Sequence, residues 1–405
     1  MTASCTASDE TASSESPTFS RNCKGVAVSS TSSIQTLIST NPPHTTFCLA
    51  AGTHLLSERI ETSDRFPILD LRAGAVIDGQ NGAFIGFDGV DPPPDEAGTI
   101  VLGGVFQHFG NSTSPSWVTP IIVRRNSAVV GTEFTKNFNA GLAVQGDNAR
   151  VSRVNTHHNG RYGLVVTPAC SDCSGPENVL IENSNIAFNN TRMLPTNDAA
   201  GGTKFSAGTN GMVVRGNTVH DNYGAGLWWD GFNTNARIYD NLIYDNYNWG
   251  IMWELSYGGA RIHHNTLTDN GIGDGSSMNF FNNVQLLISC SDGSTGGIEI
   301  YANTIDGAAY PLALINHSAH PTRTRNVYVH DNTMTLRSTA SRVGATAFNG
   351  LTEIFSASAN NRFEDNTYRV PNYAATYWGW NGESLTWTQW QGLGQDRNGS
   401  ISLNP

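Results

Sequence analysis

The sequence lacks the features of a helical, membrane-spanning or nucleic-acid-binding protein. It contains no stretch of roughly 20 apolar residues, which argues against a transmembrane helix. Apolar residues do not recur at helical spacing, and only 14% of the residues are charged. Lysine occurs three times, and the formal net charge is −11, so the basic surface expected of a nucleic-acid-binding protein is missing. The negative charge also mildly disfavours a strongly anionic polymer as substrate, unless a local basic patch overrides it.

Cysteine is sparse and irregularly spaced, with six residues in the chain. Cys170 and Cys173 resemble half of a zinc site, but no second such pair follows at zinc-ligand spacing. We therefore expect a local disulfide in an exported protein, secreted or periplasmic after removal of a signal peptide. Residues 1–24 are predicted to form a polar N-terminal extension. Cys5 precedes much of this polar stretch, so a cell-surface lipoprotein is the alternative location, although Thr-Ala-Ser before it matches a lipidation site poorly.

What the chain does contain is a repeat. Asn217-Thr-Val-His-Asp-Asn is followed 24 residues later by Asn241-Leu-Ile-Tyr-Asp-Asn, and 24 residues after that by Asn265-Thr-Leu-Thr-Asp-Asn. Short apolar segments of the form Gly-apolar-x-apolar follow these repeated sequences, as in Gly226-Leu-Trp-Trp and Gly250-Ile-Met-Trp. A fixed period of this size, with strands bounded by Gly, Asn and Asp, predicts an all-β solenoid of stacked coils.

These repeats resemble those of right-handed parallel β-helix proteins of the pectate-lyase-like superfamily, in particular exported bacterial members that act on carbohydrates. The opening Thr46-Phe-Cys-Leu-Ala-Ala-Gly-Thr-His and the closing Thr386-Trp-Thr-Gln-Trp resemble the ends of such chains. The resemblance implies a right-handed parallel β-helix over residues 25–369 with an N-terminal cap, whose helix we expect near Ile34. A Trp-rich C-terminal cover is expected over residues 370–405. The repeated asparagines are expected to form buried hydrogen-bonded ladders at a corner of the coil.

Alignment of the strands places two carboxylates side by side. Because side chains alternate along a strand, the third and fifth positions of each aligned segment face outward. Asp230 and Glu254 then occupy equivalent outward positions on adjacent coils, next to Trp228 and Met252. The intervals of 24 residues are the shortest measured, whereas 168–177, 192–201 and 271–296 look like insertions. We therefore expect the two acids to lie on the floor of a cleft with loops as walls.

A pair of carboxylates in an aromatic-lined cleft favours hydrolysis of glycosidic bonds in a poly- or oligosaccharide. Glu254 is the expected general acid, because Trp253 and Met252 give it apolar surroundings, and Asp230 is the expected nucleophile or base. The strand spacing of about 4.8 Å favours a retaining mechanism. Trp228 and Met252 are predicted to contact the sugar. Asp198 and Asn279, which lie in the insertions, are further predicted substrate contacts.

Two alternatives stay open from the sequence. Lys204 with Arg237 and Arg261 could form the site of a polysaccharide lyase or C5-epimerase, in which a cation neutralises a uronate carboxylate and a base removes the C5 proton. The Asp-Pro-His-Asp motif of mannuronan epimerases in this superfamily is absent. A non-catalytic, glycan-binding or adhesive β-helix is the third interpretation. No cofactor is required, Ca²⁺ is possible, and we expect a monomer without a metal site, a nucleic-acid partner or a membrane span.

Overall fold

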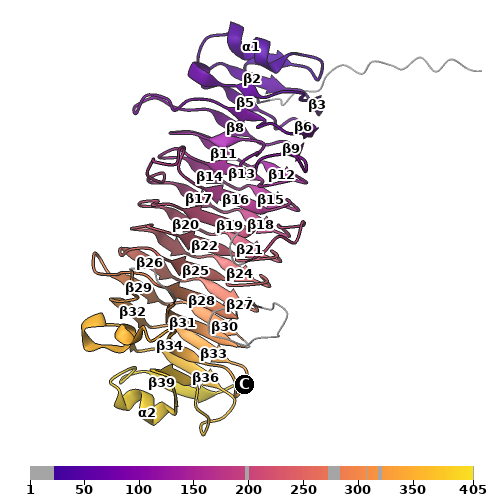
Figure 1. Ribbon diagram of the computed structural model, residues 1–405. Helices are drawn as coiled ribbons and strands as arrows, with labels where there is room; N and C mark the ends of the chain where they lie inside the picture. The colour runs from indigo at the N-terminus through magenta and orange to yellow at the C-terminus, as the bar shows by residue number, and fades with distance from the viewer. Residues whose placement is uncertain (1–21, 197–199, 272–282, 308, 318–321, 405) are drawn as a thin grey trace, which may run out of the picture.

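The computed structural model describes residues 22–404 except 197–199, 272–282, 308 and 318–321. It is an elongated stack of coils, as Figure 1 shows, and most coils contribute one short strand to each of three sheets. Neighbouring strands of a sheet therefore come from successive coils and pair in parallel, for example Trp229 with Trp253. This arrangement confirms the predicted right-handed parallel β-helix.

The strands of the three sheets, called I, II and III, follow in the order in which they pair. Sheet I contains β1 (Val26–Val28), β2 (Thr46–Leu49), β5 (Ile68–Asp70), β8 (Ile100–Leu102), β11 (Ala128–Val130), β14 (Arg150–Ser152), β17 (Leu180–Glu182), β20 (Val213–Arg215), β23 (Arg237–Tyr239), β26 (Ala260–His263), β29 (Ile298–Tyr301), β32 (Val327–His330) and β35 (Arg362–Glu364). Sheet II contains β3 (Gly52–Leu55), β6 (Ala75–Gly82), β9 (Val105–Phe109), β12 (Glu133–Thr135), β15 (Asn155–His157), β18 (Asn185–Ala187), β21 (Thr218–His220), β24 (Leu242–Tyr244), β27 (Thr266–Thr268), β30 (Thr304–Gly307), β33 (Thr333–Leu336), β36 (Thr367–Val370) and β39 (Ser400–Leu403). Sheet III contains β10 (Ile122–Val123), β13 (Leu142–Val144), β16 (Tyr162–Val166), β19 (Gly201–Ser206), β22 (Leu227–Asp230), β25 (Ile251–Glu254), β28 (Val284–Ser289), β31 (Tyr310–Asn316), β34 (Val343–Ala347), β37 (Trp378–Trp380) and β38 (Glu383–Leu385). A separate pair joins β4 (Ile60–Glu61) to β7 (Phe87–Asp88), and 3₁₀ turns span Ser63–Arg65, Thr352–Phe355 and Ala357–Ala359.

The core runs along the axis of the stack. Inward positions of sheet III form a continuous column of apolar side chains, in which Leu227, Trp229, Ile251 and Trp253 are fully buried. Alternation along each strand therefore places the residues in between on the outer face, as the sequence alignment predicts.

Buried asparagine ladders hold the corners of the coils. The Asn241 side chain donates to Asn265 Oδ1 (2.9 Å), and Asn265 donates in turn to Asn303 Oδ1 (3.0 Å). Each amide also donates to a carbonyl of the preceding coil, as Asn265 does to Ile238 O at 2.9 Å. These bonds satisfy the polar groups of buried turns and confirm the structural role predicted for the repeated asparagines.

Both ends of the stack are covered. Helix α1 (Ile34–Thr40) lies at the N-terminal end, as predicted, with the Ser33 side chain accepting from the Thr36 amide. At the other end, α2 (Trp387–Gly392) packs Trp390 into the core. The C-terminal segment also extends the solenoid beyond the expected limit, because β39 pairs in parallel with β36 and β37 joins sheet III.

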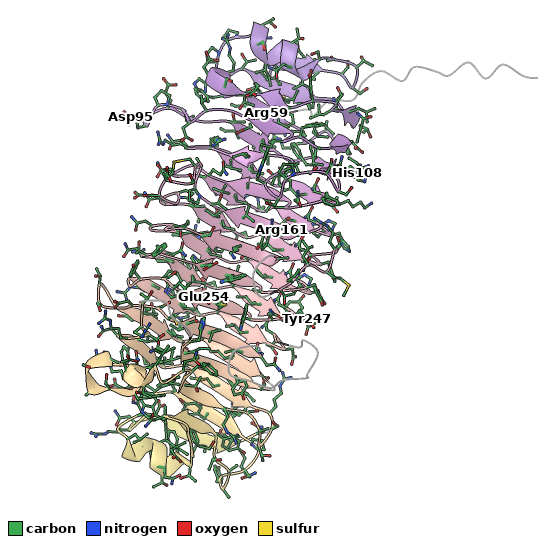
Figure 2. All side chains as sticks on the ribbon, in the orientation of Figure 1. Arg59, Asp95, His108, Arg161, Tyr247 and Glu254 are labelled. Atoms are coloured by element: carbon green, nitrogen blue, oxygen red, sulfur yellow. A yellow bond between two sulfur atoms is a disulfide. The ribbon has the colours of Figure 1, made fainter. Side chains whose placement is uncertain are left out.

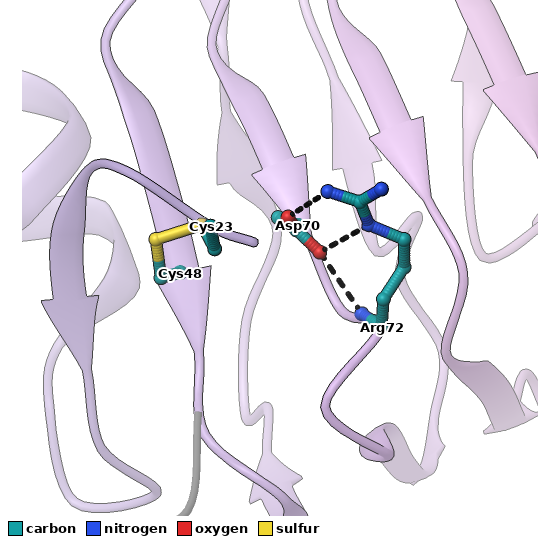
Figure 3. The surroundings of a disulfide bond; sticks show 4 residues. All are labelled: Cys23, Cys48, Asp70 and Arg72. Atoms are coloured by element: carbon teal, nitrogen blue, oxygen red, sulfur yellow. Dashed lines mark hydrogen bonds and ion pairs between the residues drawn. A yellow bond between two sulfur atoms is a disulfide. The ribbon is translucent and has the colours of Figure 1, made fainter. Parts of the chain in front are cut away.

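Two disulfides are present in the described part of the chain. Cys23 is bonded to Cys48 beside the Asp70–Arg72 ion pair, where it ties the N-terminal segment to sheet I (Figure 3). Cys170 is bonded to Cys173, which confirms the predicted local disulfide. Disulfides persist in oxidising compartments, so this pair of bonds favours an extracellular or periplasmic protein. The described helices include none that is long and apolar enough to span a membrane.

Candidate functional site

Sheet III brings the predicted acids together. Asp230 at the end of β22 pairs in register with Glu254 at the end of β25, and Trp228 pairs with Met252. On the preceding coil, Ser206 is the register partner of Asp230. The alignment of the Gly-apolar-x-apolar segments is therefore confirmed, because a fixed strand length between equivalent turns leaves no freedom in the register.

Each acid has a basic side chain as its neighbour. Lys204 Nζ on β19 lies 2.9 Å from Asp230 Oδ2 and 3.9 Å from the centre of the Trp228 ring. His317, just after β31, places its Nε2 3.3 Å from Glu254 Oε1. The Trp228 indole donates to Glu254 Oε2 at 3.2 Å. Lys204, Asp230, Trp228, Glu254 and His317 thus form one connected cluster on the outer face of sheet III.

This cluster is less open than the sequence predicts. Trp228 and Met252 stand on the outer face but are only 2% and 1% exposed, so the prediction that they offer surfaces to a sugar is wrong for this conformation. They belong to a second apolar cluster on that face, together with Trp249 and Leu287. The Glu254 side chain is 9% exposed, and that of Asp230 is 26% exposed.

The open groove lies over the three coils that precede the expected ones. A groove of about 330 Å³ runs over β13, β16 and β19 rather than over the two short coils of Asp230 and Glu254. Its lining residues are Ser116, Trp117, Thr119, Ala140, Ala143, Gln145, Arg161, Tyr162, Val165, Thr167, Lys204 and Ser206. Lys204 joins the groove to the cluster, because the same side chain lines the groove and pairs with Asp230. Figure 2 labels Arg161 in the middle of the stack and Glu254 nearer the C-terminal end.

The charge of the groove differs from that of the protein. Its described lining residues include the cations Arg161 and Lys204 and no carboxylate, in a chain whose net charge is −11. Arg161 also lies 5.2 Å from the ring centre of Tyr162. Hydroxyl side chains, among them Thr167 and Ser206, add hydrogen-bonding groups to the lining. The groove therefore presents two cations among neutral polar groups, and one of them, Lys204, is paired with Asp230 at its edge.

Arg237 and Arg261 do not join this site. They are register partners in sheet I, whereas Lys204 belongs to sheet III, and Arg261 forms an ion pair with Glu299. The proposed combination with Lys204 is therefore wrong: equal spacing along the chain aligns residues within a sheet but does not bring two sheets together. Asp198 and Asn279 lie outside the described residues.

Sequence reasoning overlooked several residues of this region. Arg161 and Tyr162 immediately precede the aligned Gly163 segment, so an extension of that alignment by two residues would have found them. His317 follows the aligned Pro311–Ile315 segment in the same way. The range 271–296, which the sequence predicts to be an insertion, contains strand β28. This strand pairs with β25, which carries Glu254, and with β31, which precedes His317.

Cys290 lies behind the cluster. Its buried thiol accepts a hydrogen bond from the His317 amide at 3.2 Å and donates to the His317 carbonyl at 3.1 Å. Burial raises the pKa of this thiol, and the nearby Glu254 carboxylate adds to that effect. The Cys290 thiol therefore holds the segment that carries His317 and stays in its neutral form.

Asp221, Asp245 and Asp269 stack at the turns that follow β21, β24 and β27, between sheets II and III. Asp221 pairs with His220, and Asp269 pairs with Arg337. Burial raises the pKa of Asp245, which lies between the other two aspartates, and their charges raise it further. In the part of the chain that the structure describes, no group of three or more His, Cys, Asp or Glu side chains is arranged to hold a metal ion.

Comparisons with known proteins agree with the architecture. Residues 119–305 match the family model described as a right-handed β-helix region. No curated protein matches the chain. The A-module of a mannuronan C-5 epimerase from Azotobacter vinelandii is 16% identical, with a TM-score of 0.57 over 92% of this chain and 94% of that one.

Other structures of similar fold belong to proteins of different kinds. An α-1,3-glucanase catalytic unit from Streptomyces thermodiastaticus is 13% identical, with a TM-score of 0.41 over 82% of this chain and 62% of that one. A surface adhesin of Streptococcus pneumoniae is 11% identical, with a TM-score of 0.38 over 87% of each chain. At these identities the likeness shows the fold alone.

Proposed function

We propose that this chain, which has the right-handed parallel β-helix fold of the pectate-lyase-like superfamily, binds a uronate-containing polysaccharide in the groove over β13, β16 and β19. We propose further that it removes the C5 proton of a bound uronate, as a lyase or a C5-epimerase does. The observation that carries this proposal is the charge of the groove, where Arg161 and Lys204 line an otherwise neutral surface. The epimerase of similar fold acts, by its name, on mannuronan.

Lys204 is the central residue of the proposed mechanism. Its position is fixed by Asp230 at 2.9 Å and by the Trp228 ring beneath it, so its ammonium group is held at the groove surface. Together with Arg161, it would neutralise the uronate carboxylate and stabilise the negative charge that develops when the C5 proton leaves. We assign Tyr162 as the base, whose phenolic oxygen takes the C5 proton after giving its own to solvent, and the Lys204 ammonium as the acid that returns a proton to C5 or to the C4 oxygen.

The two outcomes differ in the step after proton removal. If the electrons expel the oxygen at C4, the chain is cut and one product carries a C4–C5 double bond. If C5 instead receives a proton on the opposite face, the configuration is inverted and the polymer stays intact. The groove chemistry serves both reactions, since each begins with a neutralised carboxylate and a base at C5.

Glycoside hydrolysis by Asp230 and Glu254 is the second candidate, and their register pairing favours it. Such a mechanism needs one acid to protonate the leaving oxygen of a bound sugar. Here Asp230 is paired with Lys204, and Glu254 is nearly buried against Trp228 and His317. These contacts supply a positioning role for both acids, which is why we rank hydrolysis second.

Product analysis separates these functions. The purified protein is incubated with alginate, pectate and a panel of neutral polysaccharides, and the products are examined by ultraviolet absorbance, NMR and reducing-end assay. Unsaturated uronates identify a lyase, and inverted C5 without cleavage identifies an epimerase. Saturated reducing ends on either class of polymer contradict the proposal in favour of hydrolysis, and binding without products contradicts it in favour of a glycan-binding protein.

A matched pair of lysine variants tests the site. Lys204→Met removes the ammonium group from the groove and should reduce activity on uronate polymers by at least about a hundredfold, as expected for loss of a group that stabilises the transition state. Lys24→Met makes the same exchange at an exposed position outside the groove and should leave activity unchanged. Equal activity of the two variants would contradict the assignment of Lys204.

A further inference from the structure

We propose that Trp117 is a sugar-stacking subsite at the N-terminal end of the groove, which makes the protein selective for chains long enough to reach it from Lys204. The inference rests on the proposed function only for the type of sugar. Trp117 lies in the connection between β9 and β10 and lines the same groove as Lys204. It is 61% exposed, which is unusual for so large an apolar side chain.

The backbone on both sides of Trp117 is anchored. The Val118 amide donates to the Pro115 carbonyl at 3.1 Å, and the Asn139 side chain donates to the same carbonyl at 2.9 Å. Val118 and Thr119 are buried, so the chain returns to the core immediately after Trp117. The indole is therefore presented to solvent by a fixed turn, which lowers the entropy that is lost when a ligand binds.

The chemistry of an exposed indole suits a sugar ring. An apolar face of this size contributes binding free energy when it is covered, at about 25 cal/mol per Å² of area removed from water. The C–H groups of a pyranose can cover that face while its hydroxyls stay in water. Lys204 at the other end of the groove would hold the carboxylate, so Trp117 and Lys204 recognise different parts of one polymer.

The distance between the two ends requires more than one sugar. The connection that carries Trp117 leads into β10, and Lys204 lies on β19, with β13 and β16 between them. Three strand spacings of about 4.8 Å place these coils about 14 Å apart along the stack. A monosaccharide bound at Lys204 therefore does not reach Trp117, whereas a chain lying along the axis does.

The test measures affinity against chain length by isothermal titration calorimetry. Oligouronates of increasing length are titrated into the wild type, Trp117→Ala and Trp117→Phe, and a neutral series from a glucan is run in parallel. We expect the affinity of the wild type to rise at the length that reaches Trp117. Trp117→Ala should lose about tenfold for the long oligomers only, which corresponds to about 1.4 kcal/mol. Trp117→Phe, which keeps a ring face, should retain most of the gain.

Tyr373→Ala is the matched control, because it removes another exposed ring at the C-terminal end of the stack. An equal loss in Trp117→Ala for short and long chains, or no loss at all, overturns the subsite even if the protein acts on uronates. Length-dependent binding of the neutral series alone overturns the uronate proposal, and the Trp117 variants in that series then decide on the subsite separately.

Discussion

Removal of one buried asparagine should destabilise the whole stack. Asn265 donates from its amide to Ile238 O, His263 O and Asn303 Oδ1, and its Oδ1 accepts from the backbone and the side chain of Asn241. The amide has two hydrogens for three acceptors, so one contact is shared, and Asn265→Ala loses the equivalent of about four hydrogen bonds. At about 1 kcal/mol each, the expected loss is about 4 kcal/mol.

The neighbouring residue supplies the control. Thr266 is exposed on β27, and Thr266→Ala should change stability by no more than about 0.5 kcal/mol. Guanidinium unfolding followed by circular dichroism gives the two free energies, and hydrogen exchange shows whether the Asn241 amide, which loses its acceptor, becomes labile. If the free energies of unfolding of Asn265→Ala and Thr266→Ala differ by less than about 1 kcal/mol, the ladder does not hold the coils together.

Two further predictions concern titrating groups. Burial raises the pKa of Glu182, but hydrogen bonds from Arg215 and Arg150 outweigh it, so the folded-state pKa lies below the ordinary value. The carboxylate therefore contributes stability above its unfolded-state pKa, and this stability is lost as the pH falls through the folded-state pKa. The melting temperatures of wild type and Glu182→Gln should accordingly converge in acid. Melting temperatures that stay equally far apart at every pH would contradict this. The hydrogen bond to Glu364 raises the pKa of Tyr328 to about 12. Alkaline ultraviolet titration of Glu364→Gln, read against Tyr328→Phe, should show this pKa falling towards the usual tyrosine value, and coincident curves for wild type and Glu364→Gln would refute it.

The architecture and the register of the site follow from the sequence. The period of 24 residues from Asn217 to Asn265, with alternation along each strand, suffices to stack Asp230 beside Glu254 and to bury Trp229. These features are local, since they depend only on strand length and on a turn that repeats. The asparagine ladder follows for the same reason, because equivalent turns on successive coils must lie above one another.

Only the tertiary structure decided where the surface opens. Intervals between repeats count the residues of an insertion but do not say which face of the coil it covers, so the groove was expected over Trp228 and lies over the coil of Lys204 and the two before it. Whether two sets of register-aligned residues come together depends on the sheet that each occupies. Arg237 lies in sheet I and Lys204 in sheet III, so the two are apart. The contact of His317 with Glu254 joins residues 63 positions apart. Such contacts form when side chains from different coils pack together, and no period in the sequence encodes them.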